Sequence, residues 1–352
     1  MKNLLTALLP VALLLAPVVR SAPPTMQAIV QAGADAASFQ LQTVPAPAPG
    51  ADQVLIRVYA AAVNPVDWKR RPAPISLPSG AQLPAIPGYD AAGIVESVGA
   101  GVTAFKAGDA VVGRVNGAFA QYVVAEVAQV VPKPSWFTFE QASGIPIAGM
   151  AAYGAAEAAN IKPGQRVAII GAAGGAGSAA VDVVHAMGGK VIASGHSSQE
   201  AWLKQQGVEE FVAYDKQNVA ARIRNVDAVL NMVDGQATPA LAYVKRGGML
   251  TSIAGPPPDE QCAAAGVTCV QIRATAPGSV SPMELPGAVA RICRRDLRAD
   301  PRHGARQLHR RHAARAGQTC RRGQVHGARD EGLPAGAGRR GAAVRACRRQ
   351  RG

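Results

Sequence analysis

Short apolar runs separated by Gly and Pro turns fill the first half of the main body of the chain. The runs cover residues 54–62, 91–98, 110–115 and 119–124. Turn formers such as Gly99, Gly101 and Gly108 lie between them. Many short strands with turns of this kind predict a compact β-rich unit from residue 26 to residue 150.

The pattern changes to an alternation of strand and helix after about residue 151. Residues 167–170 are continuously apolar, as expected for a strand that is buried on both faces. Helices are predicted at 178–187 and 200–206, and further strands at 190–194, 211–214, 228–233, 249–254 and 267–274. Strands joined by helical crossovers predict a doubly wound parallel sheet over residues 151–286, so the fold class is α/β.

The first 25 residues resemble a secretory signal peptide. Lys2 precedes an apolar run over residues 4–19, and small residues and prolines follow it. The run is shorter than the roughly 20 residues that a membrane span needs. We expect export to the periplasm as an unfolded chain. The alternative is that translation begins at Met26, which would leave the protein in the cytoplasm.

The net charge of +14 is concentrated at the C-terminal end. Residues 285–352 hold 18 Arg and 4 acidic residues, so this segment carries the whole excess and the preceding 284 residues are neutral. The segment has no Phe, Trp, Tyr or Met. Such a composition cannot bury enough apolar surface to offset the entropy of ordering, so a disordered Arg-rich tail is predicted over residues 287–352.

Three interpretations of the tail stay open. The first is a basic arm that binds nucleic acid, and the second is a solvated extension without function. The third is that the segment is the translation of a GC-rich gene in the wrong reading frame from near Arg291. Reading residues 330–338 from the second nucleotide of each codon permits Thr-Lys-Val-Phe-Pro-Leu-Ala-Gln-Ala, a strand-like and then helix-like peptide. The frame hypothesis predicts reduced stability for the chain as written, and the coding DNA around codons 285–295 tests it.

A glycine-rich turn lies between the first strand of the second unit and its first helix. Such a turn lets the backbone approach a pyrophosphate closely, and the helix N-terminus offers free N–H groups to the anion. Its position within a strand–turn–helix unit predicts a dinucleotide site. The candidate residues of this turn are Gly171, Gly174, Gly175, Ala176 and Gly177.

The end of the second strand indicates which dinucleotide binds. NAD sites usually place an acid there, but this segment has no acid before Glu200. Hydroxyls and an imidazole accept a 2′-phosphate, whereas a carboxylate would repel it. We therefore expect NADPH as the cofactor. The residues expected to bind it here are Ser194, His196, Ser197 and Ser198, although His196 could instead be a loop residue without contact to the cofactor.

Several segments together resemble the medium-chain dehydrogenase/reductase superfamily, in its zinc-free quinone oxidoreductase (zeta-crystallin-like) branch. They lie in family order at residues 62–67 (AVNPVD), 87–93 (PGYDAAG), 106–111 (KAGDAV), 146–153 (PIAGMAAY) and 161–167 (IKPGQRV). The resemblance covers residues 26–286. It implies a GroES-like catalytic domain, a Rossmann-type NADP-binding domain and an active site between them. It also implies hydride transfer from NADPH to a quinone or enone.

The resemblance also indicates which residues carry the chemistry. Zinc-dependent relatives have a Cys and a His where this chain has Asn64 and Tyr89, and the body supplies too few zinc ligands, so no metal is expected. Asn64 is the candidate polar contact to substrate or nicotinamide, with an Asx-turn role before Pro65 as the alternative. Tyr89 is a candidate hydroxyl donor or a packing residue. By resemblance, Tyr214 packs beside the adenosine.

Strand ends later in the chain complete the candidate site. Asn231, Ala254 and Gly255 fall at carboxyl ends of strands, where ligands of open α/β sheets bind, and are assigned to the nicotinamide side. Cys262 and Cys269 form a disulfide if the protein is exported, or remain two buried thiols. The resemblance points to a homodimer through the sixth strand.

Two other functions compete with an oxidoreductase. One is a non-catalytic or truncated dinucleotide-binding relative. The other is a nucleic-acid-binding protein that acts through the basic tail. The tail lacks the interleaved aromatic residues that stack on bases, so no specific nucleic-acid partner is expected.

Overall fold

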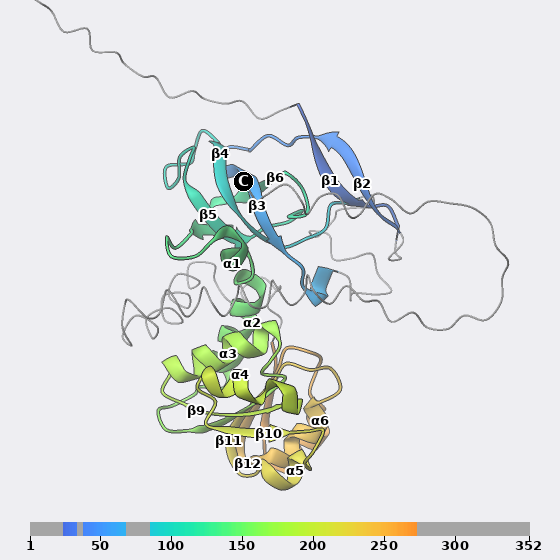
Figure 1. The fold of residues 1–352 in the computed structure, drawn as a ribbon, viewed down its shortest axis with the longest axis vertical. Helices are drawn as coiled ribbons and strands as arrows, with labels where there is room; N and C mark the ends of the chain where they lie inside the picture. The colour runs from blue at the N-terminus through green and yellow to red at the C-terminus, as the bar shows by residue number, and fades with distance from the viewer. Residues whose placement is uncertain (1–23, 34–37, 68–84, 273–352) are drawn as a thin grey trace, which may run out of the picture. The chain divides into compact units, whose positions relative to one another are not determined.

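The computed structural model describes residues 24–33, 38–67 and 85–272 (Figure 1). The signal-like segment, the end of the predicted sixth strand at residues 273 and 274, and the Arg-rich tail lie outside these residues. Within the described part of the chain, no helix combines the length and the hydropathy that a membrane span requires.

An antiparallel sheet of five strands forms the first unit, in the order β6-β3-β4-β5-β7. The strands are β3 (Gln53–Ala62), β4 (Asp90–Val98), β5 (Ala110–Arg114), β6 (Tyr122–Glu126) and β7 (Val130–Pro132). Buried aliphatic side chains from these strands, among them Val54, Ile56, Val95, Val111 and Val123, pack into one core cluster. Strands β3, β4 and β5 each hold at least three consecutive buried residues, and their Val and Ile side chains favour extended backbone.

A separate two-stranded antiparallel sheet precedes this unit. It consists of β1 (Thr25–Gln31) and β2 (Phe39–Pro45). Two isolated bridges tie β1 to the rest of the unit, one from Ala28 to Ala120 and one from Gln31 to Ala85. The sequence pattern did not predict these two strands, although β1 alternates between exposed and buried positions; β2 has no buried residue.

A six-stranded parallel sheet forms the second unit, in the order β10-β9-β8-β11-β12-β13. Its strands are β8 (Arg166–Ile170), β9 (Lys190–Gly195), β10 (Glu210–Ala213), β11 (Val226–Asn231), β12 (Val244–Ser252) and β13 (Thr268–Gln271). Strands β9 and β10 follow one another to one side of β8, and β11, β12 and β13 follow one another to the other. This is the doubly wound order, and it confirms the predicted α/β fold class.

Helices connect the parallel strands and cover the sheet (Figure 1). Two separate core clusters of buried side chains include β8 residues, Val167 and Ile169 in one cluster and Ala168 and Ile170 in the other. Both faces of β8 are therefore buried, which is why its sequence is continuously apolar. The connecting helices are α3 (Gly175–Ala186), α4 (Glu200–Gln205), α5 (Val219–Arg222), α6 (Ala237–Ala240) and α7 (Asp259–Ala265).

Helix α2 (Pro146–Ala158) follows α1 (Phe139–Ser143) and joins the two units. It packs against α3 and also contacts β5 of the antiparallel sheet. The domain boundary predicted between residues 150 and 151 lies inside this continuous helix. Ten of its residues are buried, because its small side chains allow close packing on more than one side.

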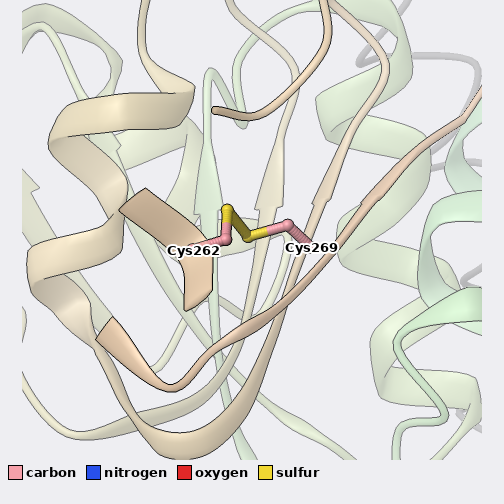
Figure 2. Close-up of a disulfide and its surroundings, with 2 residues drawn as sticks. All are labelled: Cys262 and Cys269. Atoms are coloured by element: carbon pink, nitrogen blue, oxygen red, sulfur yellow. A yellow bond between two sulfur atoms is a disulfide. The ribbon is translucent and has the colours of Figure 1, made fainter. Parts of the chain in front are cut away.

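A disulfide joins α7 to the edge strand β13. The Sγ atoms of Cys262 and Cys269 are bonded, and the two Cα atoms lie 6.1 Å apart (Figure 2). Cys262 is the buried residue of α7. Of the two alternatives left open by the sequence, the structure therefore has the disulfide, which links α7 covalently to the sheet.

Candidate functional site

The carboxyl ends of the parallel strands lie in register along one edge of the sheet. Ile170 of β8 pairs with Ser194 of β9 on one side and with Asn231 of β11 on the other. Gly195 pairs with Ala213, and Asn231 pairs with Ser252. The segments that the sequence analysis selected after β8, β9, β10, β11 and β12 therefore meet at one edge. Ligands of open α/β sheets bind at this edge, where the strand order reverses.

The glycine loop turns from β8 into α3 at the point where the strand order reverses. Gly171 has φ +83°, and a Cβ atom there would lie 2.4 Å from Cγ2 of Val233. A Cβ atom on Gly177 would lie 2.1 Å from the carbonyl oxygen of Gly171. Both positions require glycine, since any side chain would push the loop away from the helix.

The first turn of α3 points unpaired N–H groups into this loop. Gly174 caps the helix, and its carbonyl accepts the first intrahelical bond, from the N–H of Ser178 at 2.9 Å. The N–H groups of Gly175, Ala176 and Gly177 precede that bond and have no partner within the helix. Together with the dipole of a 12-residue helix, they suit a pyrophosphate.

The loop after β9 folds into a short 3-10 turn, η4 (Ser197–Gln199), capped by His196. The Nδ1 atom of His196 accepts from the N–H of Ser198 at 3.2 Å and lies 2.9 Å from its hydroxyl. The ring of Tyr214 meets the His196 ring edge-on, with centroids 6.1 Å apart. Tyr214 is 58% exposed, so its face is open for packing against a ligand. The structure thus brings these predicted residues together, with Ser194 buried behind them.

An acidic residue that sequence reasoning missed lies in this loop. The carboxylate of Asp215 accepts the N–H of Ser197 at 2.8 Å and its hydroxyl at 2.7 Å. These hydrogen bonds, led by that of the hydroxyl, hold the pKa of Asp215 below its usual range. The segment after β9 has no acid before Glu200, as the sequence indicated, but a carboxylate from another segment reaches it. Asp215 follows β10, not β9, and the pairing of Gly195 with Ala213 brings the two strand ends together.

The candidates on the nicotinamide side hold the ends of two strands together. The Nδ2 atom of Asn231 donates to the hydroxyl of Ser252 at 3.1 Å, and its Oδ1 atom accepts from the N–H of Val233 at 3.2 Å. Asn231 is 1% exposed, so its side chain orders the strand ends. Ala254 and Gly255 follow β12 in a loop where Gly255 has φ +135°.

Asn64 lies between two buried carboxylates in the first unit. Its backbone N–H donates to Oδ2 of Asp67 at 2.6 Å, and its Nδ2 atom donates to Oδ2 of Asp90 at 2.9 Å. Asp67 caps the turn η2 (Pro65–Asp67), so Asp67, rather than Asn64, closes the turn. The Asn64 carboxamide is held in a fixed orientation by Asp90, and sequence reasoning did not select Asp90.

Burial dominates the electrostatics around Asp90. Loss of solvation raises the pKa of Asp90 to about 8, against the lowering effect of its hydrogen bonds from Asn64 and Ile147. Burial also raises the pKa of Asp67. Arg114 is the cross-strand partner of Asp90, and its guanidinium lies 5.6 Å from the centroid of the Tyr89 ring. Tyr89 is 6% exposed and lies among these groups, and its catalytic role stays a prediction.

Asp90 connects the Asn64 turn to the glycine loop through the start of α2. Its Oδ1 atom accepts from the N–H of Ile147 at 3.0 Å. The next residue, Ala148, has its Cβ atom 3.9 Å from the position that a Cβ on Gly175 would take. Two hydrogen bonds therefore link Asn64 to the start of α2, and Ala148 of that turn lies near Gly175 at the N-terminus of α3.

Among residues 24–33, 38–67 and 85–272, no three His, Cys, Asp or Glu side chains gather in a group that could hold a metal ion. The polar groups of the site are instead amides, hydroxyls, buried carboxylates and main-chain N–H groups. Such groups can bind an anionic dinucleotide and donate hydrogen bonds to an acceptor oxygen.

Comparison with known proteins agrees with this geometry. Residues 50–135 match the alcohol dehydrogenase GroES-like domain. The quinone oxidoreductase of Coxiella burnetii superposes with a TM-score of 0.66 at 26% identity, over 76% of this chain and 88% of that one. These similarities support the resemblance to the medium-chain dehydrogenase/reductase superfamily, in its quinone oxidoreductase-like branch.

Two curated relatives belong to plants. The chain is 35% identical over 216 residues to the 2-methylene-furan-3-one reductase of Solanum lycopersicum, which covers 58% of this chain and 55% of the relative. It is 32% identical over 216 residues to the chloroplastic NADPH-dependent alkenal/one oxidoreductase of Arabidopsis thaliana, with the same coverage. The chain spans a little over half the length of these relatives.

Proposed function

We propose that this protein is an NADPH-dependent, zinc-independent oxidoreductase that transfers a hydride to the double bond of an enone or to a quinone. The observation that carries the proposal is the glycine loop from β8 into α3, at the point where the strand order reverses. The acceptor class is supported by the relatives, which include a furanone reductase, an alkenal/one oxidoreductase and a quinone oxidoreductase.

The loop residues fit a dinucleotide because the chain has kept side chains out of its path. A Cβ atom at Gly171 would collide with Val233 at 2.4 Å, and one at Gly177 with the Gly171 carbonyl oxygen at 2.1 Å, so either would shift the tight turn that holds the pyrophosphate in this proposal. In this proposal the first-turn N–H groups of α3 hold the pyrophosphate, and the exposed ring of Tyr214 packs beside the adenosine. The bound nicotinamide supplies the hydride.

The substrate side is built around Asn64. Hydride delivery to an enone carbon, or to a quinone, places negative charge on the acceptor oxygen, and a fixed donor stabilises that charge. Nδ2 of Asn64 has two hydrogens, and only one is needed for the bond to Asp90. The second hydrogen is available to the acceptor oxygen. A proton from water then completes the reduced product.

Zinc independence is part of the proposal, and it rests on Asn64 and Tyr89. Neither an amide nor a phenol at these positions is a ligand that zinc prefers. Activity of the metal-free protein, measured after dialysis against a chelator with metal content assayed in parallel, tests this point. Zinc independence would be contradicted if removal of the metal abolished the activity and added zinc restored it.

The cellular location follows as a further proposal. The Cys262–Cys269 disulfide supports export, because disulfides persist in oxidising compartments. The need for NADPH supports the alternative, a cytoplasmic protein that starts at Met26. N-terminal sequencing of the protein from its native cells distinguishes a processed chain from one that starts at Met26.

The activity is tested with the full chain, NADPH, and parallel panels of enones and quinones, following the loss of reduced nicotinamide absorbance. Gly175→Ala adds a methyl group at the helix N-terminus without a clash, since its nearest neighbour would be Ala148 at 3.9 Å. We expect this variant to lose at least about tenfold in NADPH affinity. Gly144→Ala at the end of α1, whose added Cβ would have its nearest neighbour at 3.7 Å, is the matched control and should bind NADPH normally.

Two results would overturn this proposal in different ways. Binding of NADPH without oxidation by any acceptor would indicate a non-catalytic dinucleotide-binding relative. Failure to bind any nicotinamide or adenine nucleotide would show that the proposed dinucleotide site does not exist.

A further inference from the structure

Two hydrogen-bond donors and one imidazole nitrogen in the loop after β9 lie around one carboxylate. The N–H and the hydroxyl of Ser197 both donate to Asp215, at 2.8 Å and 2.7 Å. Nε2 of His196 lies 3.6 Å from Oδ2 of the same carboxylate. Since Nδ1 of His196 accepts from Ser198, the proton of the neutral ring is on Nε2 and faces Asp215. The loop thus forms a small anion site, and the Asp215 carboxylate occupies it.

These donors are the groups that a 2′-phosphate would need. A phosphate monoester carries a charge of about −1.5 to −2 and binds through its acceptor oxygens. To bind here it must displace the Asp215 carboxylate from Ser197, and it must then share the loop with that negative charge. A ribose 2′-hydroxyl has the opposite requirement, because it can donate a hydrogen bond to the carboxylate.

We propose that Asp215 determines the discrimination between the two nicotinamide dinucleotides. Its carboxylate competes with the 2′-phosphate of NADPH for Ser197 and His196, and it accepts a hydrogen bond from the 2′-hydroxyl of NADH. The carboxylate therefore narrows the preference of the chain for NADPH over NADH, and its loss widens that preference. This inference rests on the dinucleotide site of the proposed function.

The location of Asp215 allows a clean test. Its side chain is 24% exposed and lies on the loop surface, so Asp215→Asn removes the charge without opening the core. The exposed neighbour Lys216 then leaves the loop with a net positive charge. Asp109 offers a matched control in the antiparallel unit, because its carboxylate likewise accepts a backbone N–H and a side-chain donor, both from Lys106.

The experiment measures binding of adenosine 2′,5′-bisphosphate and of 5′-AMP to the full chain by calorimetry. These probes differ in the 2′-phosphate and require no hydride transfer. Asp215→Asn should strengthen bisphosphate binding about tenfold and change AMP binding less than twofold, since it removes one like charge near the phosphate. The ratio of the dissociation constants of NADH and NADPH should rise by a similar factor. Asp109→Asn should change neither.

A second variant tests the donors. Ser197→Ala keeps the carboxylate and removes the hydroxyl, so bisphosphate binding should weaken further while AMP binding is kept. An unchanged ratio of bisphosphate to AMP affinity in Asp215→Asn would overturn the inference and leave the dinucleotide site intact. Absence of binding of either probe to wild type and variants would instead overturn the site itself, and the inference with it.

Discussion

The carboxylate of Asp90, at the start of β4, accepts a hydrogen bond from the main-chain N–H of Ile147, in the first turn of α2. The two residues are 57 positions apart in the sequence. The same carboxylate orients the Asn64 amide. One buried acid thus fixes the candidate substrate residue and the start of the helix that packs against α3.

The first prediction concerns the pH dependence of stability. Burial raises the pKa of Asp90 to about 8 from 3.8, so the folded protein retains a proton that the unfolded chain releases. Stability should therefore fall as pH rises between about 4 and 8, by at most about 1.4 kcal/mol per pH unit for one proton, and level off above that range. Chemical denaturation at a series of pH values measures this slope.

Asp90→Asn should flatten that slope, because an amide does not titrate. The variant should also be less stable than wild type at pH 5, since its amide must now face the Asn64 amide. Asp67 faces the same turn and also has a raised pKa, and Arg114 lies on the neighbouring strand, so Asp67→Asn is measured in parallel. An equally steep slope in Asp90→Asn would show that another group carries the proton.

The second prediction concerns Asn64. Asn64→Ala removes the donor proposed for the acceptor oxygen, and loss of one such donor typically lowers the rate by about 100-fold to 1,000-fold. The value of kcat/KM for the enone or quinone should fall by that order, while NADPH affinity stays within twofold. Asn218→Ala, at the cap of α5, is a matched amide deletion away from the site. A rate within twofold of wild type would exclude Asn64 from the reaction.

The third prediction concerns Gly175 and Gly177, which lie two residues apart in the first turn of α3. A Cβ on Gly177 would meet the Gly171 carbonyl oxygen at 2.1 Å and the Ala172 Cα at 2.7 Å, both main-chain atoms that cannot rotate away. Gly177→Ala should cost about 1–3 kcal/mol of stability. Gly175→Ala, with open space around it, should cost none. Thermal melting compares them, and equal melting temperatures would show that the loop yields easily.

The fourth prediction concerns the disulfide. Replacing both Cys262 and Cys269 by Ser should lower the free energy of unfolding by about 2–3 kcal/mol, as expected for a short closed loop. It also removes the covalent link between α7 and β13, so amide exchange should accelerate over residues 259–271. A reductant should lower the melting temperature of wild type to that of the double variant.

The double variant provides the control for this experiment, because it keeps the other three cysteines of the chain. Its melting temperature should not respond to the reductant. A response as large as that of wild type would assign the redox sensitivity to those other cysteines.

Local patterns in the sequence were sufficient to predict the fold class and the cofactor loop. The apolar run of β8, the glycines after it and the helix that follows are neighbours in the chain, so period and turn chemistry reveal them directly. The same is true of Asn64 in its turn. These features depend on backbone conformation and on burial of both faces of a strand, which short segments encode.

Tertiary structure decided which residues act together. Asp90 reaches Ile147 and Asn64 only because β3 and β4 pair and α2 begins beside them. Asp215 reaches Ser197 only because β9 and β10 are parallel neighbours whose ends are in register. Burial likewise raised the pKa of Asp90, and no local pattern encodes the loss of solvation. Sequence therefore determined the scaffold and its glycine loop, whereas contacts between distant segments determined the charges that surround the site.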